Sequence, residues 1–537
     1  ERNNMRHSIA LLATGCLTLA MASVMPSAVA TPAPDAAAAT TEQAVALPNI
    51  PYTRFQLPNG LTVVVSEDHK APVVAVSVWY HVGSSYEPAG KTGFAHLFEH
   101  LMFQGSENHK GEFFDPFEKV GATDMNGTTW LDRTNYFETV PTTALDMALW
   151  MESDRMGHLL GAIDQKTLDE QRGVVQNEKR QGENQPYGQL RQVVAKTMYP
   201  EGHPYHHTTI GSMNDLNAAS LDDVKQWFRT WYGPNNAVLV LAGDIDVATA
   251  KEKVARYFGD IPASPTMEQP KVQIAPLAES GRTVLEDKVP QVMVRRIWNV
   301  PEYGSTDSTL LDLFSQVLGG SATSRLDKRL VHEDQLVDSI GTANWSSQLG
   351  GSFFINAMVK KDVDEKKVEA VIDEELQKLL AEGPTAEELA QAKTMFRAGF
   401  IRGVERIGGF GGKADVLAAC QTYTGEPDCY QDVLRDIQAA TPEQVRAVAE
   451  PAPRSLDDLL ARVREVRQRG YAVDRGESFA GVIGVAVPLT PWSPSDPLLA
   501  IGAALPAEVT DEQTVHEVGA ALQEAARQLT NPLAVRA

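Results

Sequence analysis

Residues 94–103 read FAHLFEHLMF, a short apolar segment interrupted by two histidines and a glutamate. His96 and His100 are four residues apart, so in a helix with 3.6 residues per turn their side chains emerge on one face. Glu99 lies beside them on that face. A zinc hydrolase needs ligands for a cation, an open coordination position for water and a base that deprotonates the water. The segment therefore predicts a metal-binding helix with His96 and His100 as ligands and Glu99 as the base.

The order His-x-x-Glu-His reverses the commoner zincin order. The alternative is an amphipathic core helix whose histidines are four residues apart by chance. A third protein ligand must come from elsewhere, because long-range ligand spacing is set by the fold and not by the helix period. A second helix is predicted at 164–181, and the pattern alone leaves Glu170, Glu178 and Glu183 open as the third ligand.

The composition describes a folded, acidic protein of several domains. The chain has 537 residues, of which 43% are hydrophobic, and this is enough to form packed cores. Its formal net charge is −22, whereas a nucleic-acid-binding surface needs a basic stripe. We therefore expect no nucleic-acid partner, and the charge is compatible with cationic substrates.

The N-terminal residues have the pattern of a secretory signal peptide. A basic start at 5–7 is followed by an apolar run at 9–25 and by small residues up to Ala30, where cleavage would fit. An uncleaved membrane anchor is the alternative. We expect export, to the periplasm or beyond, after which Cys420 and Cys429 are the only cysteines left. Because an exported protein meets an oxidising compartment, these two cysteines are predicted to form a disulfide.

Several strands are predicted around the metal helix. Residues 55–65 contain an Asn59-Gly60 turn between two apolar runs, which is a strong hairpin pattern. A buried strand is predicted at 71–80. The segment 121–140, rich in Thr, aromatic residues and turn formers, predicts a hairpin or an edge strand.

These features together resemble the inverted-zincin peptidases that include pitrilysin, insulin-degrading enzyme and the mitochondrial processing peptidase. The resemblance covers about residues 52–449. It implies an α+β fold of two homologous domains, each a mainly antiparallel sheet packed with helices. The resemblance rests on four segments: His96-Leu-Phe-Glu-His100, Asn126-Gly-Thr128, Thr134-Asn-Tyr136 and Arg172-Gly-Val-Val-Gln-Asn-Glu178.

The resemblance also assigns the site. It selects Glu178 as the third ligand beside His96 and His100, and it implies one Zn²⁺ per chain with Glu99 activating a zinc-bound water. In the family an open strand edge binds the substrate backbone by β-augmentation. Asn126 and Gly127 occupy the corresponding position and are predicted to bind substrate, with an ordinary turn as the alternative.

The sequence departs from the family at one position near the third ligand. The family usually has a second Glu seven residues before the ligand, where this chain has Gln171 with Glu170 beside it. A neutral amide can still orient a neighbouring side chain by hydrogen bonding but adds no negative charge. We therefore expect Gln171 or Glu170 to orient a ligand, with metal affinity or activity reduced by roughly one or two powers of ten.

The chain divides into a series of predicted segments. The second predicted domain repeats the pattern of the first without its histidines, and the tail resembles a fragment of the effector-binding lobe of IclR-type regulators. The predicted segments are a signal peptide at 1–30, a flexible leader at 31–51, a catalytic zinc-peptidase domain at 52–260, a Pro-rich linker at 261–282, a second non-metal domain at 283–449 and an unrelated extension at 450–537.

The predicted function is that of a zinc metalloendopeptidase acting on peptides or unfolded polypeptides. One alternative is a non-catalytic, peptide-binding partner subunit, although such members usually lose the motif that is intact here. The other is a ligand-binding regulator fragment fused at the C-terminus, although no helix-turn-helix precedes it. Because two-domain relatives commonly pair, we expect a homodimer or a heterodimer with a related non-catalytic chain.

Overall fold

The computed structural model describes residues 47–265, 267–270, 280–449, 471–475, 482–488, 500–506, 510 and 512–529. The signal peptide predicted at 1–30 and the leader up to residue 46 lie outside the described residues. Part of the predicted linker lies outside them too. The same holds for residues 456–469, for which the sequence predicts a helix.

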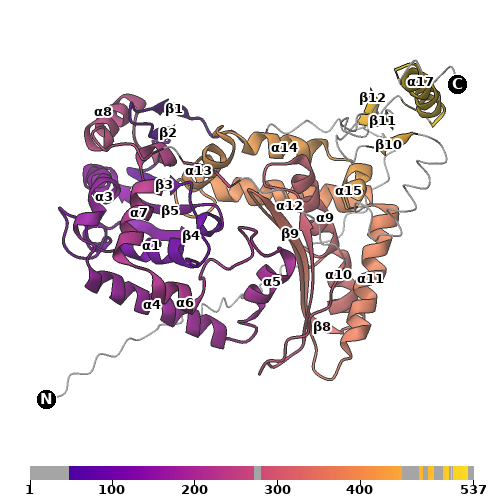
Figure 1. Ribbon diagram of the computed structural model, residues 1–537, viewed down its shortest axis with the longest axis horizontal. Helices are drawn as coiled ribbons and strands as arrows, with labels where there is room; N and C mark the ends of the chain where they lie inside the picture. Colours follow the sequence, from indigo (N-terminus) through magenta and orange to yellow (C-terminus); the bar gives the residue numbers. More distant parts are fainter. Residues whose placement is uncertain are drawn as a thin grey trace, which may run out of the picture. The chain divides into compact units, whose positions relative to one another are not determined.

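The first half of the chain forms a six-stranded sheet with helices (Figure 1). The strand order is β1-β2-β6-β3-β5-β4, with one parallel pair, β2 and β6, and antiparallel pairing elsewhere. The strands are β1 Thr53–Gln56, β2 Thr62–Glu67, β3 Val73–Tyr80, β4 Thr123–Thr129, β5 Thr134–Pro141 and β6 Ala237–Gly243. The helices are α1 Phe94–Met102, α2 Asp115–Lys119, α3 Leu145–His158, α4 Gln165–Asn184, α5 Leu190–Met198, α6 Met213–Ala218, α7 Leu221–Trp231 and α8 Val247–Phe258.

The second half repeats part of this arrangement. Its strands are β7 Met293–Val300, β8 Val337–Ser347 and β9 Gly350–Val359, paired antiparallel in the order β7-β9-β8. This order matches β3-β5-β4, and α9 follows β7 as α1 follows β3. The helices are α9 Thr306–Leu318, α10 Arg325–Asp327, a π-helical turn Lys328–Glu333, α11 Glu365–Glu382, α12 Ala386–Val404, α13 Lys413–Thr424, α14 Tyr430–Ala439 and α15 Pro442–Val448.

The central strands of the first sheet are buried on both faces. Successive side chains of a strand point to opposite faces, so the unbroken apolar sequence VVAVSVWY of β3 supplies two cores. Val76 and Val78 belong to the core that contains α1. Ala75 and Trp79 belong to a second apolar cluster on the other face.

The second cluster is completed by residues from the far end of the chain. Leu417 and Cys420 of α13, with Tyr430 and Leu434 of α14, pack in the cluster that contains Trp79. In Figure 1 the orange helix α13 lies beside the indigo strands of the first sheet. A disulfide joins Cys420 to Cys429, with 5.3 Å between their Cα atoms. The fold is therefore α+β, and the second half of the chain covers the first sheet.

Most of the predicted elements are found in the structure. The predicted hairpin is confirmed as β1 and β2, with Gly60 at φ +92° in its turn, a conformation that favours glycine. The sequence also predicts a strand at 237–243 and a helix at 247–258, and β6 and α8 have these bounds. Strand β8 was not predicted, because its sequence VDSIGTANWSS has too few apolar residues to show alternation.

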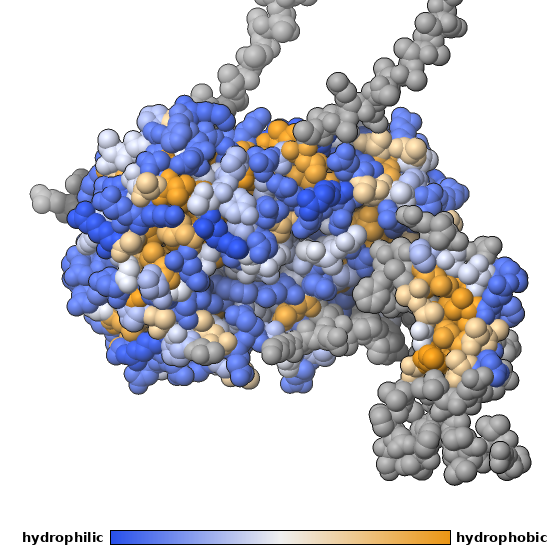
Figure 2. Space-filling view, turned by 90° about the horizontal axis from the view of Figure 1, so that it is seen from above, coloured by the Kyte–Doolittle hydropathy of each residue, from blue (hydrophilic) through white to orange (hydrophobic). Residues whose placement is uncertain are grey.

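The C-terminal extension contains a small α/β unit. It consists of β10 Ala472–Arg475, β11 Val482–Pro488, β12 Ala500–Pro506 and α17 Glu512–Leu529, with the strands antiparallel in that order. The sequence predicts strands at 482–487 and 498–504 and a final helix near 510–529, and β11, β12 and α17 are found there. Among the described residues, no helix is long and apolar enough to span a membrane. In the face of the protein that Figure 2 shows, hydrophilic residues predominate and apolar residues gather in separate patches.

One ion pair lies inside the core of the first half. The Arg155 guanidinium binds the Glu152 carboxylate, and both side chains are excluded from solvent. The guanidinium also lies over the rings of Phe113 and Tyr136, 3.7 and 4.2 Å from their centroids. Burial, together with repulsion from Glu152, raises the pKa of the adjacent Glu138 well above its ordinary value. Burial therefore favours the protonated form of Glu138, whereas Glu152 has the Arg155 guanidinium as its ion-pair partner.

We expect Arg155→Met to destabilise the protein by about 3–5 kcal/mol, because it leaves the Glu152 charge buried without a partner. The measurement is the free energy change from the shift in thermal unfolding. The double variant Arg155→Met/Glu152→Leu should recover most of the loss, since it removes both charges. Arg435→Met, which removes an exposed pair with Asp432, is the control and should cost below about 1 kcal/mol. Equal losses in Arg155→Met and Arg435→Met would contradict the expectation.

Candidate metal centre

Helix α1 presents His96 and His100 from a position that is fixed at both ends. Its N-cap residue is Gly93, which offers no side chain to cap the helix. The buried Glu87 carboxylate does so instead, accepting hydrogen bonds from the backbone N–H groups of Gly93 at 2.9 Å and Ala95 at 2.7 Å. A negative charge is favourable at this end because the helix dipole is positive there.

The other end of α1 meets a positive charge. The guanidinium of Arg155 lies 3.5 Å from the carbonyl oxygen of Met102, the last residue of α1. The dipole makes this end of the helix negative, so a buried cation stabilises it. Helix α1 is thus held between two buried charges of complementary sign.

Helix α4 brings Glu178 to α1. The Asp164 side chain caps its start by accepting a hydrogen bond from the Thr167 N–H at 2.8 Å. Leu168 and Val175, seven residues apart and therefore on one face, are fully buried in the core that contains α1. Glu178 is three residues beyond Val175, so it projects near this face toward the two histidines.

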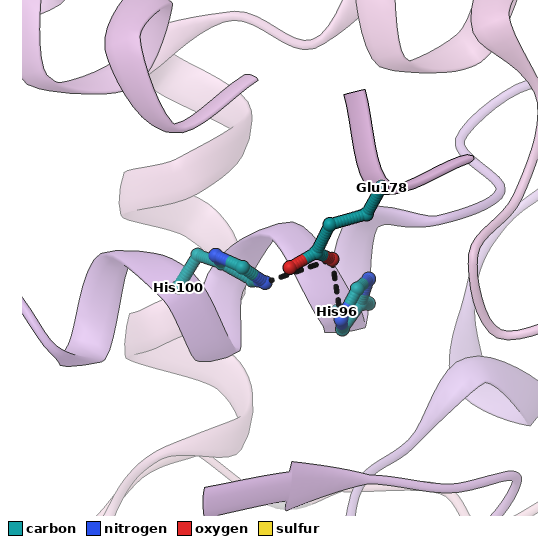
Figure 3. Close-up of side chains that lie close together, drawn as sticks. All are labelled: His96, His100 and Glu178. Carbon is teal, nitrogen blue, oxygen red and sulfur yellow. Dashed lines mark ion pairs between the residues drawn. The ribbon is translucent and has the colours of Figure 1, made fainter. Parts of the chain in front are cut away.

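The three side chains converge on one point, as Figure 3 shows. An oxygen of Glu178 lies 3.6 Å from the His96 Nε2 atom and 3.4 Å from the His100 Nε2 atom. These separations exceed those of ordinary hydrogen bonds. Two donor atoms bonded to one tetrahedral Zn²⁺ at about 2.0–2.1 Å lie roughly 3.4 Å apart. The spacing and the N, N, O donor set therefore fit a zinc ion.

Both imidazoles are in the protonation state that a metal ligand requires. Burial, with repulsion from His100, lowers the pKa of His96 to about 4. Burial also lowers the pKa of His100, although the Glu178 carboxylate opposes this shift. At neutral pH both rings are uncharged, and a neutral imidazole has a free lone pair for a cation.

Glu99 lies on the same helix and is nearly buried. Its carboxylate accepts a hydrogen bond from the Thr129 hydroxyl, at the end of β4, with 2.5 Å between the oxygens. Burial raises the pKa of Glu99 to about 7, although the hydrogen bond from Thr129 lowers it. A carboxylate with this pKa can take up and return a proton near neutral pH.

Strand β4 lies at the edge of the sheet, beside the metal helix. Among the strands that the structure describes, only β5 pairs with it, so the other edge of its backbone has no strand partner there. Asn126 is exposed on this strand, and Gly127 is buried opposite Tyr136. A Cβ atom on Gly127 would lie 2.6 Å from the Phe103 ring, which explains why glycine is needed there.

The remaining predicted residues lie in different surroundings. Gln171 lies near His100, and its side chain raises the pKa of that ring. Glu170 is exposed and lies 3.7 Å from the Lys166 ammonium. Glu183 pairs with Lys179 at 2.7 Å. Of the three glutamates that the pattern left open, the structure brings only Glu178 to the two histidines.

Several residues that position the site were not foreseen. Glu87 lies in a polar loop, and nothing in its local sequence indicates a buried carboxylate. The sequence HPYHH at 203–207 predicts a structural or substrate-facing loop, with a metal ligand as the alternative. In the structure the Nε2 atom of His207 lies 2.9 Å from the Glu87 carboxylate. Arg155 is the one of these residues that the sequence indicates, because the helical pattern around it places it on the buried face of α3.

Sequence comparisons agree with this geometry. The description "Insulinase (Peptidase family M16)" matches residues 62–210, and "Peptidase M16 inactive domain" matches residues 218–396. The zinc protease PqqE of Helicobacter pylori is 31% identical over 361 residues, which cover 65% of this chain and 79% of that protein. The chain belongs to the M16 peptidase family. The segment that matches the description of the inactive domain contains α9, and this helix has no histidine.

Other M16 relatives share the sequence or the fold. A mitochondrial-processing peptidase β subunit of Arabidopsis thaliana is 24% identical, with 58% of this chain and 60% of that protein covered. The crystal structure of a protease from Helicobacter pylori superposes with a TM-score of 0.69 at 28% identity, covering 75% of this chain and 96% of that one. The first half of the periplasmic protease PqqL from Escherichia coli has the same fold, with a TM-score of 0.60 at 21% identity and coverage of 74% and 88%.

The C-terminal extension matches a different family. Residues 438–531 match the description "Bacterial transcriptional regulator IclR C-terminal". The match begins within α14, so it includes α15 as well as the small α/β unit. The extension shares no residue with the metal centre.

We expect Glu178→Gln to lose bound zinc, because an amide is a weaker ligand and only two strong protein donors then remain. Glu170→Gln, the matched control on the exposed face of the same helix, should lose much less. The measurement is the zinc-to-protein ratio of the purified variants. Full zinc in Glu178→Gln with loss in Glu170→Gln would overturn the assignment of the third ligand.

Proposed function

We propose that this protein is a zinc-dependent endopeptidase that hydrolyses peptides or unfolded polypeptides. The observation that carries the proposal is the convergence of His96, His100 and Glu178, with Glu99 on the same helix beside the open edge of β4. The names of the relatives as zinc proteases support the choice of metal. We assign one Zn²⁺ per chain to the three ligands.

The chemistry divides between the cation and the side chains around it. Zn²⁺, when bound, polarises a water molecule and the carbonyl of the peptide bond. The Glu99 carboxylate takes a proton from the attacking water and passes it to the nitrogen that leaves. The Thr129 hydroxyl holds this carboxylate in place through its 2.5 Å hydrogen bond. Burial keeps bulk water away and gives Glu99 a pKa suited to both transfers.

The substrate is bound as an extended chain. The open edge of β4 offers backbone N–H and C=O groups to a peptide, which adds to the sheet as a further strand. We assign Asn126 and Gly127 to this contact. Because the substrate must present a free backbone edge, peptides and unfolded segments are suitable and folded domains are not.

The non-catalytic alternative explains fewer observations. A subunit that only binds peptides has no use for two neutral imidazoles and a carboxylate at metal-ligand spacing. The M16 description matched to the second half is named inactive, but the first half carries the ligands. We therefore place catalysis in the first half, and the second half lies beside it as part of the substrate-binding cleft.

We also propose that the protein is exported and works in the periplasm. The predicted signal peptide supports this location, and the relative PqqL is described as a periplasmic protease. The Cys420–Cys429 disulfide suits an oxidising compartment. The present chain spans 46% of complete PqqL, so two copies would approach its size, and we propose a homodimer.

We expect Glu99→Gln to lower the turnover of a quenched fluorescent peptide by roughly 10²–10⁴-fold while zinc stays bound, because a base is lost and a ligand is not. The measurement combines kcat with zinc content. Glu170→Gln serves as the control and should keep both. Near-normal turnover by a zinc-loaded Glu99→Gln protein would refute the proposed role of Glu99.

We expect Gln171→Glu to leave zinc content unchanged and to raise kcat. Gln171 lies near His100, so a carboxylate there would accept a hydrogen bond from the ring and increase its basicity as a ligand. The gain should be up to roughly tenfold, by the scale of such contacts. Glu170→Gln in the same background tests whether the Glu170 carboxylate replaces the carboxylate that is missing at position 171. Unchanged kcat in Gln171→Glu would show that the amide already orients His100 fully.

A further inference from the structure

A cavity lies where the second half repeats the metal helix. Its volume is about 400 Å³. His96 and His100 are the third and seventh residues of α1, and Ser308 and Asp312 are the third and seventh residues of α9. Both Ser308 and Asp312 line this cavity. The second half thus keeps a polar site at the equivalent place, with a carboxylate in place of an imidazole.

Among the described residues, the carboxylate in this cavity has no counter-ion. Asp312 is partly buried, and the Asn344 side chain donates a hydrogen bond to it at 3.1 Å. In the part of the chain that the structure describes, no cationic side chain pairs with Asp312. Burial raises the pKa of Asp312 to about 6, although the hydrogen bond from Asn344 lowers it. The group is therefore ionised at neutral pH, and a partly buried anion is stabilised by a cation.

The other lining groups also suit a cation. The Asn344 Oδ1 atom is buried and, among the described residues, has no hydrogen-bond donor. Trp130 and Trp345 line the cavity with 41% and 57% of their surfaces exposed. Their ring centroids are 6.3 Å apart and the rings are nearly perpendicular, at 81°. Aromatic faces attract cations, and a guanidinium both stacks on such rings and offers a fork of N–H donors.

The cavity adjoins the place where the substrate strand would pass. Trp130 directly follows Thr129, the last residue of β4 and the residue that contacts Glu99. A peptide added to the open edge of β4 and continuing past Glu99 therefore reaches Trp130. The cavity is in the size range of ligand pockets, about 300–1,000 Å³, and has room for one long side chain.

We propose that this cavity binds the guanidinium side chain of an arginine in the peptide substrate, with Asp312 as its counter-ion and Trp130 and Trp345 as its walls. The ligand's identity as a substrate residue rests on the proposed peptidase function, whereas the chemistry of the cavity does not. Lysine should bind less tightly than arginine, because an ammonium lacks the flat fork.

The test measures binding of labelled peptides to the full chain carrying Glu99→Gln. The probe is a fluorescein-labelled peptide with one arginine, and its matched partner carries citrulline, which has the same shape without the charge. Fluorescence anisotropy should give roughly tenfold tighter binding of the arginine peptide, the scale of one charge-assisted contact. Adding Asp312→Asn should reduce this ratio to below about twofold.

Asp307→Asn is the control for Asp312→Asn. Asp307 is exposed on the same helix but does not line the cavity, so its loss should leave the tenfold ratio intact. Trp345→Leu provides a second test if Asp312→Asn fails to fold. Because Trp345 is mostly exposed, the variant should fold. It should weaken binding of the arginine peptide by about two- to tenfold and leave binding of the citrulline peptide unchanged.

Moving the arginine along the peptide separates a pocket from general attraction to an acidic protein. A pocket at a fixed distance from β4 predicts preference at one position, and equal preference at every position would overturn the proposal. A tenfold ratio that survives Asp312→Asn would also overturn it. If the wild-type protein cleaves no peptide but the ratio still depends on Asp312, the cavity assignment holds and the proposed peptidase function fails. Cleavage with no arginine preference would remove the cavity assignment alone.

Discussion

The Glu87 carboxylate accepts hydrogen bonds from the Gly93 and Ala95 amides while it is excluded from solvent. The metal centre depends on this contact, because α1 has no N-cap side chain of its own and His96 follows Ala95 directly. Arg155 performs the complementary task at the other end of the helix. A metal site needs ligand atoms held to within about half an ångström. Two buried charges at the ends of a nine-residue helix provide that restraint without occupying its ligand face.

The two halves of the chain meet through a second buried carboxylate. Asp132 accepts hydrogen bonds from the Tyr205 hydroxyl, the Ser85 hydroxyl and the backbone N–H of Gln348. The Leu349 N–H in turn donates to the Tyr205 hydroxyl at 2.9 Å. The loop after β4 is thereby joined to the turn between β8 and β9. Trp130 and Trp345 stand just before these anchored residues, so the same contacts set the distance between the two tryptophans.

Local sequence patterns predicted much of the fold and the central residues of the site. Periodicity and turn residues indicated the β1–β2 hairpin, β3, β6, α1 and α4 because each has a strong apolar pattern of its own. His96, Glu99 and His100 were readable because one helix face holds all three. Glu178 needed the family resemblance, since the distance from His100 depends on how α4 packs against α1.

The remaining features depend on tertiary contacts that no local pattern encodes. Glu87 lies in a loop whose polar sequence suggests an exposed residue, and only the fold places it beneath α1. The cavity around Asp312 is lined by Trp130 in the loop after β4 and by residues of α9 and β8, which are far apart in sequence. No local pattern marks its polar residues, and Asp312 lies beside Trp130 and Trp345 only through the fold.

The packing of α13 and α14 on the first sheet has a consequence for the order of folding. The outer face of β3 and β6 stays uncovered until Leu417 and Leu434 have been synthesised. These residues follow β6 by nearly two hundred positions, so at roughly 5–20 residues per second the apolar face waits on the order of ten seconds or more. During that interval the nascent chain presents a sheet surface that a chaperone can hold.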